Sequence, residues 1–479
     1  MAFNSFDYIV FLCAVFALYW PFRHYRGVRL TLLLLASYVF YAAWNGWYLL
    51  LIVLSTTLDY AAGHLIYRYD ARPGLRRLFF LISVVTNLSL LGFFKYANFF
   101  LDNTEWAIAA FGFQLQLPNL DVLLPIGISF YTFQSLSYTL DIYLRQLEPT
   151  RSFRDFFLFV SYFPQLIAGP IVRAKEFLPQ LHRPAELDDQ ALSAGIYRLL
   201  RGLVKKMVIA DYLAGALVDP VFNAPEVFTS AEAFMALVGF HFQIYCDFSG
   251  YTDIALGSAR LFGFRLPDNF DQPYKAHTPA NYWRRWHMTL SRFAFDYLYR
   301  PLGGSKRGTW VTYRNTLITF TVIGFWHGAN WNYVLFGVYH AVGVILTRLL
   351  TTAVGYWRGV APRAVEDGWT GKVLAILCTN LYIIFSLPLF RSPDMLTAGQ
   401  VYAQVFAFEG WELGFRPVAL AVLALPVISH YVPPRLEVAM IESFARLRPA
   451  YQFASVLAVS FATHELATLA KQSFVYFQF

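Results

Sequence analysis

Long apolar runs restrict the fold of this 479-residue chain more than any other feature. A helix needs about 20 mostly apolar residues to cross a bilayer, and runs near that length recur along the whole sequence. Several are short or interrupted by proline and glycine, which is tolerated only where the segment is buried in protein or lines a cavity. We therefore expect an all-α polytopic membrane protein, a bundle of about 11 transmembrane helices with re-entrant and interfacial helices. The predicted spans lie near residues 6–21, 29–44, 47–66, 78–100, 121–143, 232–248, 314–326, 329–350, 372–390, 416–432 and 452–470.

The composition agrees with a membrane location. Only 14% of residues are charged, against about a quarter in soluble domains, and the 19% of aromatic residues is typical of rings at a membrane interface. The net charge of +8 is explained better by basic cytoplasmic loops than by nucleic-acid binding. Three cysteines lie far apart, without disulfide or zinc spacing. The first 20 residues lack the features of a cleaved signal peptide, so we expect a retained span.

Basic residues predict the orientation of the spans. The loops between spans near 45–46 and 101–120 contain no lysine or arginine. The other early loops are basic, and they carry Arg23, Arg26 and Arg29; Arg68, Arg72, Arg76 and Arg77; and Arg145, Arg151 and Arg154. Because positive loops stay in the cytoplasm, we expect an extracytoplasmic amino terminus.

Two stretches in the middle of the chain do not fit simple spans. Residues 162–177 contain prolines at 164 and 170 and are too short to cross, so we expect a re-entrant or interfacial segment. Residues 195–218 carry four basic side chains among leucines, at helical spacing. That pattern predicts an amphipathic helix lying on the cytoplasmic surface of the membrane.

Residues 264–315 are the polar centre of the chain. They hold nine Lys or Arg against three Asp, which is most of the net charge. This basic platform is either a loop that contacts lipid phosphates or a docking surface for a phosphate-bearing donor, and its interleaved aromatic rings fit both interpretations. The segment "PLGGSKRG" lacks the spacing of a P-loop. Candidate donor-binding residues are Arg284, Arg285, Trp286, Lys306 and Arg307.

A histidine, His327, interrupts the apolar run "ITFTVIGFWHGANWNYVLFGVYH". A helix rising from Arg314 would carry it about 20 Å into a core about 30 Å thick, and an ionisable group at that depth is a functional-site hypothesis. The alternative is a histidine bonded to a nearby carbonyl. Gly328, Asn330 and Asn332 follow directly and favour a broken helix that lines a cavity. Burial would keep the imidazole neutral, as a general base requires.

Other candidates are weaker. His287, in "WRRWHMTLS", is either an ordinary interfacial histidine or a second polar group that orients His327 or binds the donor carbonyl. In the stretch 245–257, Asp247 and Asp253 could pair with platform arginines or bind a polar substrate, and Cys246 has no adjacent base in sequence to activate it as a nucleophile. The stretch 124–143 would line a tunnel or pack through small residues. The sequence says little about the histidines at 241, 277, 340 and 464.

Two motifs carry a family resemblance. "NYWRRWHMTLSRFAFDYLYRPLGG" followed by "GFWHGANWNYVLFGVYHA" resembles the membrane-bound O-acyltransferase superfamily, within it most closely the bacterial alginate-type O-acetyltransferases, and the match extends over residues 1–345. The resemblance implies one integral-membrane acyltransferase domain, 1–479, whose helices surround a central tunnel. Its motif-bearing core is 1–350, and the remainder, 351–479, matches no motif. It also implies that His327 is the essential catalytic residue and that His287 occupies the second family position.

The resemblance further implies the reaction. An acetyl group from a cytoplasmic thioester, acetyl-CoA, would move across or through the bacterial inner membrane for O-acetylation of an extracytoplasmic, alginate-like polysaccharide. Expected partners are the thioester donor, a periplasmic acetyl-accepting or polysaccharide-modifying protein and membrane lipids, with no nucleic acid, metal or permanently bound cofactor. His327 would act as a general base or be acetylated itself. Alternatives are D-alanyl or other acyl transfer to a cell-wall polymer, a glycan or lipid transporter, or a scaffold for polysaccharide export.

Overall fold

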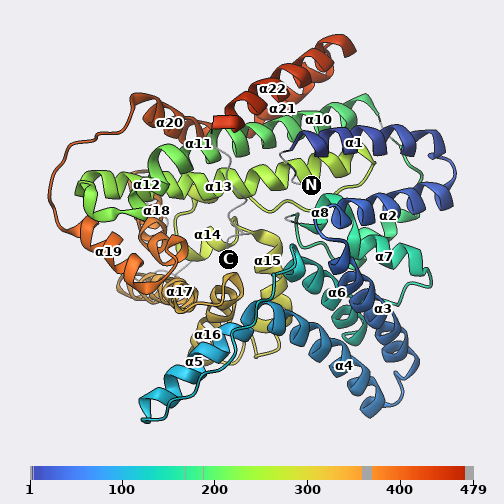
Figure 1. Cartoon of the computed structure of the whole chain (residues 1–479), viewed down its shortest axis with the longest axis horizontal. Helices are drawn as coiled ribbons and strands as arrows, with labels where there is room; N and C mark the ends of the chain where they lie inside the picture. Colours follow the sequence, from blue (N-terminus) through green and yellow to red (C-terminus); the bar gives the residue numbers. More distant parts are fainter. Residues whose placement is uncertain (1–2, 4, 168, 187, 359–368, 470–479) are drawn as a thin grey trace. The chain divides into compact units, whose positions relative to one another are not determined.

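A computed structural model describes the whole chain except residues 1–2, 4, 168, 187, 359–368 and 470–479 (Figure 1). The described residues form helices and connecting loops and contain no β-strand. The chain folds into two compact units. Unit 1 comprises residues 1–201, 251–267 and 441–449, and unit 2 comprises 202–250, 268–440 and 450–479. The expectation of a single domain stays a prediction.

The helices of unit 1 come mainly from the first 200 residues. They are α1 (Phe6–Tyr19), α2 (Arg26–Ala42), α3 (Gly46–Arg68), α4 (Pro73–Leu91), α5 (Ala97–Ala110), α6 (Ile128–Tyr143), α7 (Phe153–Ser161), α8 (Phe163–Leu166) and α9 (Ala174–Leu181). Two helices from the middle of the chain, α10 (Asp189–Leu203) and α13 (Ser230–Leu261), have residues in both units.

Unit 2 contains most of the remaining helices. These are α11 (Asp211–Leu213), α12 (Asp219–Asn223), α14 (Pro279–Trp283), α15 (Met288–Ala294), α16 (Thr309–His327), α17 (Trp331–Arg358), α18 (Trp369–Arg391), α19 (Met395–Phe406) and α20 (Pro417–Tyr431). Two further helices follow near the carboxyl end, α21 (Pro434–Ala445) and α22 (Pro449–Leu469), and their residues are divided between the two units.

The length and apolarity of the helices support a multi-pass membrane protein. Four described segments can cross a bilayer, namely Gly46–Arg68, Pro73–Ala110, Trp331–Gly355 and Trp369–Arg391. A fifth is counted if the bent pair Pro417–Tyr431 and Arg435–Ala445 forms one broken span. The predicted count of about 11 spans is not confirmed. One reason is that some apolar runs, such as the one near 6–21, form helices of only 14 residues.

A buried carboxylate joins three helices of unit 1. Asp59 of α3 is fully buried; it accepts hydrogen bonds from Ser83 Oγ (2.6 Å) and Asn87 Nδ2 (2.9 Å) of α4. Ser135 of α6 donates a third. In this part of the chain, the polar face of the stretch 124–143 serves helix packing, which was one of its two predicted roles.

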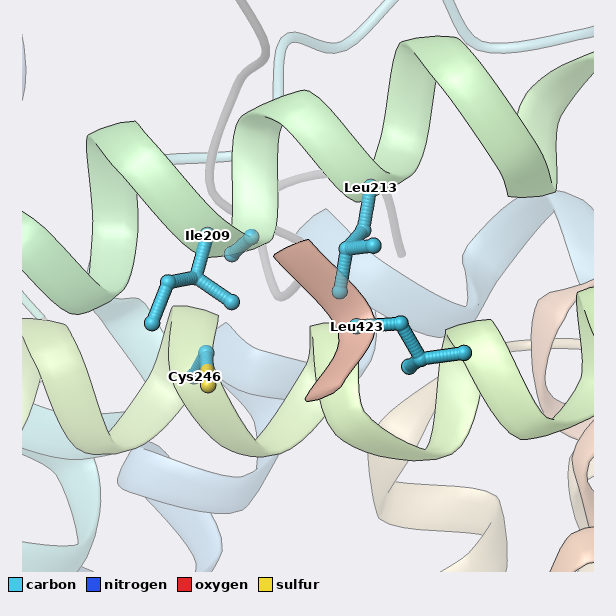
Figure 2. Close-up of a cluster of buried hydrophobic side chains, with 5 residues drawn as sticks. Ile209, Leu213, Cys246 and Leu423 are labelled. Atoms are coloured by element: carbon cyan, nitrogen blue, oxygen red, sulfur yellow. The ribbon is translucent and has the colours of Figure 1, made fainter. Parts of the chain in front are cut away.

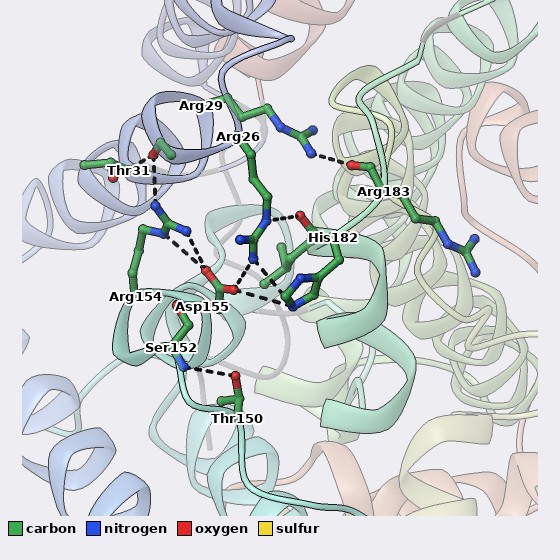
Figure 3. A network of polar contacts seen from close by, with 11 residues as sticks. Arg26, Arg29, Thr31, Thr150, Ser152, Arg154, Asp155, His182 and Arg183 are labelled. Atoms are coloured by element: carbon green, nitrogen blue, oxygen red, sulfur yellow. Dashed lines mark hydrogen bonds and ion pairs between the residues drawn. The ribbon is translucent and has the colours of Figure 1, made fainter.

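A second buried carboxylate, Asp155 of α7, connects α2, α7 and α9 (Figure 3). Arg26 forms an ion pair with it. Arg154 Nη2 lies 3.0 Å from its Oδ1, and His182 Nε2 lies 3.7 Å from its Oδ2. Ser152 Oγ accepts a hydrogen bond from the Asp155 amide at the start of α7. Basic residues of the predicted cytoplasmic loops therefore also hold unit 1 together, because paired positive charges offset the cost of burying an ionised carboxylate.

The stretch 195–218 is packed inside the protein, so the prediction of a helix lying on the membrane surface is wrong. Lys206 is 1% exposed, and its Nζ lies 2.6 Å from Asp211 Oδ1 and 2.7 Å from Asp247 Oδ1. In unit 1, Arg198 and Arg201 pair with Asp253. Three of the four basic side chains on this stretch, those of Arg198, Arg201 and Lys206, bind carboxylates. Sequence spacing does not distinguish this arrangement from lipid binding. Asp247 and Asp253 thus pair with basic residues of this stretch.

Cys246 belongs to an apolar core of unit 2. It packs in α13 beside Ile209, Leu213 and Leu423 (Figure 2), and it is 1% exposed. A thiol in such surroundings acts as a small apolar side chain. The structure gives no support to the alternative that Cys246 carries the acyl group.

Candidate active site

The site lies in unit 2, where two glycines bring α16 and α17 into close contact. A Cβ atom at Gly324 would lie 2.2 Å from the carbonyl oxygen of Tyr333, and one at Gly337 would lie 2.3 Å from the carbonyl oxygen of Phe320. Backbone therefore meets backbone at this crossing, as in small-residue contacts between membrane helices. The close contact fixes the end of α16, which carries His327.

His327 is the last residue of α16, and the chain continues through extended Gly328 to the start of α17 at Trp331. The predicted break in the helix after the histidine is therefore confirmed. The imidazole is 3% exposed. Its ring lies edge-on to Phe390, with centroids 5.1 Å apart, and to Phe336, with centroids 6.2 Å apart. Aromatic rings from α17 and α18 thus set its orientation.

His287 precedes α15 and is fully buried. Its backbone adopts a left-handed conformation with φ 42°, which is strained for a residue other than glycine. The next amide, of Met288, donates to Asn269 O at 2.9 Å, and Thr289 Oγ1 donates to Asn269 Oδ1 at 2.6 Å. Asn269 therefore holds the turn in place, which is how a strained conformation persists.

The two predicted histidines flank one tryptophan ring. Trp326 lies 4.9 Å from the His327 ring and 6.2 Å from the His287 ring, measured between centroids. Phe248 packs edge-on against His287 at 4.7 Å. Burial lowers the pKa of His287 to about 3, so its imidazole is neutral at physiological pH. His287 is thus placed to support the site through Trp326.

A narrow cavity of about 20 Å³ adjoins His327, with room for about one water molecule. Two more histidines line it, His241 of α13 and His340 of α17. The His241 ring stacks on Tyr274 at 3.8 Å, and its Nε2 lies 3.1 Å from Asn380 Oδ1. Neither histidine was predicted as a site residue. The one signal for them in the sequence was a polar side chain within an apolar run, and many core histidines share that signal.

A second, much larger cavity of about 870 Å³ is lined by residues of the basic platform, 264–315, and of α16 and α17. Its wall includes the exposed side chains of Arg284, Arg292 and Arg348, together with hydroxyl groups such as those of Thr316 and Thr319. Such a wall can accommodate an anionic, elongated ligand, because guanidinium groups pair well with phosphates. Arg348, from α17, was not among the predicted donor-binding residues.

The five predicted donor-binding residues do not lie together. Arg284 lines the large cavity, whereas Trp286 lines the narrow one. Arg285 Nη1 donates to the Asp271 side chain at 3.2 Å. Lys306 and Arg307 are exposed in the loop before α16 and line neither cavity. Their role in donor binding stays a prediction.

Hydrogen bonds to backbone carbonyl groups fix the loop at residues 301–308. Asn315 Nδ2 of α16 donates to the carbonyl oxygens of Leu302 (3.2 Å) and Gly304 (3.0 Å). Gly303 and Gly304 both have positive φ angles, as tight turns require. The loop thus forms a braced turn, which agrees with the absence of P-loop spacing in the sequence.

Trp283, the last residue of α14, is the one described residue that lines both cavities. Its ring is 6% exposed and lies edge-on to Phe320 (5.3 Å) and to His340 (5.1 Å). Within the described residues its indole nitrogen is buried without a hydrogen-bond partner. Trp283 therefore forms the shared wall between the large cavity and the cavity that holds His327.

Comparison with known proteins gives the family. The family model described as membrane-bound O-acyltransferase matches residues 76–388. A probable alginate O-acetylase, AlgI, of Pseudomonas aeruginosa is 38% identical over 86% of this chain and 76% of its own length. A peptidoglycan O-acetyltransferase of Helicobacter pylori is 35% identical over 80% of this chain and 74% of its own length. A teichoic acid D-alanyltransferase of Bacillus subtilis is 26% identical over 55% of this chain and 68% of its own length.

The chain belongs to the membrane-bound O-acyltransferase family. It is accordingly an acyltransferase and a multi-pass membrane protein. The resemblance carried by the two histidine motifs is thereby confirmed. The matched region, residues 76–388, includes His287, His327 and all the residues that line the two cavities except Phe390.

Proposed function

We propose that the protein transfers an acetyl group from a cytoplasmic thioester, acetyl-CoA, to hydroxyl groups of an extracytoplasmic polysaccharide similar to alginate. The names of the Pseudomonas and Helicobacter relatives support both the acetyl group and a polysaccharide acceptor. D-alanyl transfer to a cell-wall polymer is the second candidate, favoured by the more distant Bacillus relative. A donor competition assay between acetyl and D-alanyl thioesters separates the two.

The observation that carries the proposal is the pair of cavities that share Trp283. Exposed Arg284 and Arg348 on the large cavity would pair with the donor phosphates. The donor's flexible arm would then pass Trp283, so that its thioester reaches the narrow cavity beside His327. This path keeps the reacting atoms away from bulk water, which limits hydrolysis of the thioester.

In the proposed reaction, neutral His327 removes the proton of the incoming hydroxyl group. The hydroxyl oxygen attacks the thioester carbonyl carbon, the C–O bond forms and the C–S bond breaks. The proton held by the imidazole then passes to the departing thiolate. General-base assistance of this kind contributes about 10²- to 10⁴-fold in rate. In the alternative route, the imidazole is itself acetylated and passes the group to the hydroxyl, and rapid acid quenching with mass spectrometry would detect that acetyl-imidazole.

The proposed setting is the bacterial inner membrane, with an extracytoplasmic amino terminus and basic loops in the cytoplasm. The alternation of basic and non-basic loops among the first spans supports this orientation. A periplasmic protein that accepts the acetyl group or modifies the polymer, together with surrounding lipid, completes the proposed set of partners. Cysteine-accessibility labelling of the loop at residues 111–120, which follows α5, tests the orientation in intact cells, because that loop should react from outside.

Replacement of His327 by Ala tests the function. We expect H327A to lose at least about 10²-fold in acetyl transfer, measured with radiolabelled acetyl-CoA in membrane vesicles at matched protein level. The control is H64A, because His64 lies in unit 1, away from the site, and its ring hydrogen-bonds the Tyr60 carbonyl of its own helix (2.9 Å). Polysaccharide acetylation at the normal rate in H327A would refute the catalytic role.

A further inference from the structure

His340 differs from His241 and His430, two other buried histidines of unit 2. It is 1% exposed, and neither ring nitrogen has a hydrogen-bond partner among the described residues. By contrast, His241 Nε2 lies 3.1 Å from Asn380 Oδ1, and His430 Nε2 accepts a hydrogen bond from the Tyr274 amide at 3.0 Å. A buried polar group without a hydrogen-bond partner destabilises the protein. A ligand atom in the adjoining cavity would remove that destabilisation.

Apolar and aromatic side chains hold the His340 ring. Phe336 lies 4.4 Å away, Trp283 5.1 Å and Tyr382 5.9 Å between ring centroids, each in an edge-on arrangement. This packing fixes the ring without supplying an acidic partner. A neutral imidazole carries one N–H donor and one acceptor nitrogen.

His340 and His327 line the same narrow cavity and contact the same phenylalanine. The Phe336 ring lies 4.4 Å from His340 and 6.2 Å from His327, measured between centroids. His327 ends α16, whereas His340 lies in the following helix, α17. The cavity of about 20 Å³ accommodates a small group only. A thioester carbonyl group that reaches His327 in this cavity therefore also lies close to the His340 ring.

We propose that His340 is a second catalytic residue, whose ring N–H donates a hydrogen bond to the carbonyl oxygen of the acyl group. This inference rests on the proposed function. As the hydroxyl oxygen attacks, negative charge moves onto the carbonyl oxygen, and a fixed donor in a site without water stabilises it. His340 keeps its proton throughout, since His327 carries the transferred proton to the thiolate. The narrow cavity around both rings would then be the subsite for a short acyl group.

Two variants of His340 test this role. H340F keeps a ring of similar size and removes both nitrogens, whereas H340Q supplies an amide donor in place of the imidazole. We expect H340F to lower kcat by about 10²- to 10³-fold, the range for loss of one oxyanion donor, while the KM for acetyl-CoA changes less than about threefold. We expect H340Q to recover at least about tenfold of that loss. A purely structural role predicts no rescue by Gln.

The result that overturns the proposal is a kcat for H340F within about threefold of the wild-type value, or a raised KM at unchanged kcat. If H340F does not accumulate in membranes, kcat is compared between H340Q and H340A instead. We expect the kcat of H340A to be at least about tenfold lower than that of H340Q. H327A, run in parallel, separates the two proposals. If the wild-type protein itself transfers no acetyl group, the proposed function fails; if the wild-type protein is active and H327A is not, the H340F result judges His340 alone.

Discussion

The contact between α16 and α17 makes a sharp prediction about Gly324. Replacement by Ala would place a Cβ atom 2.2 Å from the Tyr333 carbonyl oxygen and 2.8 Å from the α-carbon of Gly337. Because a Cβ atom essentially never lies within 3.0 Å of such an atom, the helices must separate by at least about 0.8 Å there. The obstacle is backbone and cannot rotate away. The displacement falls one turn before His327, at the end of the same helix.

The effect on rate should exceed the effect on stability. A misplacement of about 1 Å in a catalytic group can cost about 10²-fold, so we expect G324A to transfer acetyl groups about 100-fold more slowly. Overpacking costs about 1–3 kcal/mol, and the better helix propensity of Ala returns about 0.5–1 kcal/mol of that. The thermal midpoint should therefore fall only modestly, while the loss of kcat is large.

Transfer from radiolabelled acetyl-CoA in vesicles, and the thermal midpoint of detergent-extracted protein, measure the two effects. Gly399 of α19 provides a matched control, because a Cβ atom there meets nothing within 4 Å. G399A should keep the wild-type rate and gain slightly in stability. A wild-type rate and midpoint in G324A would refute the argument that backbone contact positions His327.

Two further predictions concern Trp283 and His287. W283A should join the two cavities. We therefore expect the variant to use acyl-CoA donors with acyl chains longer than acetyl, and to hydrolyse the donor faster. If the relative rates with donors of different acyl-chain length are unchanged, Trp283 is not the shared wall. The pKa of His287 is about 3 in the folded protein and about 6.5 in the unfolded protein. Between about pH 6.5 and about pH 3 the unfolded state therefore binds a proton that the folded state does not. The free energy of unfolding falls as the pH drops through this range. We expect about 2 kcal/mol of stability to be lost by pH 5. The loss should be smaller in H287N, because Asn does not titrate, and Asn is chosen because it tolerates the left-handed backbone. Parallel pH–stability curves for the two proteins would contradict this.

Several features could be predicted because they depend on short stretches of sequence. The break after His327 followed from Gly328 and the polar residues next to it, and the structure confirms it. The basic stretch 195–218 was predicted to lie on the membrane surface, but Lys206 is buried between two carboxylates. Helical spacing shows that charges share a face, but it does not show whether that face meets lipid or another helix.

Residues that act together across the fold were harder to predict. Neither His340 nor Arg348 was identified from the sequence, because a lone histidine or arginine in an apolar run has many ordinary explanations. The predicted group of platform residues was also dispersed, with Arg284 and Trp286 on different cavities. Arg284 and Trp286 lie in the turn between α14 and α15, where nearby side chains face different directions, so neighbours in sequence need not share a site.

The sequence by itself determined that this protein is helical, membrane-embedded and a member of its family, with His327 as the leading catalytic candidate. Those properties follow from composition and from local motifs, which do not require knowledge of the fold. Only the tertiary structure decided that His327, His340 and Trp283 border one narrow cavity. The physical reason is that the walls of this cavity come mainly from five helices, α13, α14, α16, α17 and α18, and their packing depends on contacts such as Gly324 against Tyr333 that join separate helices.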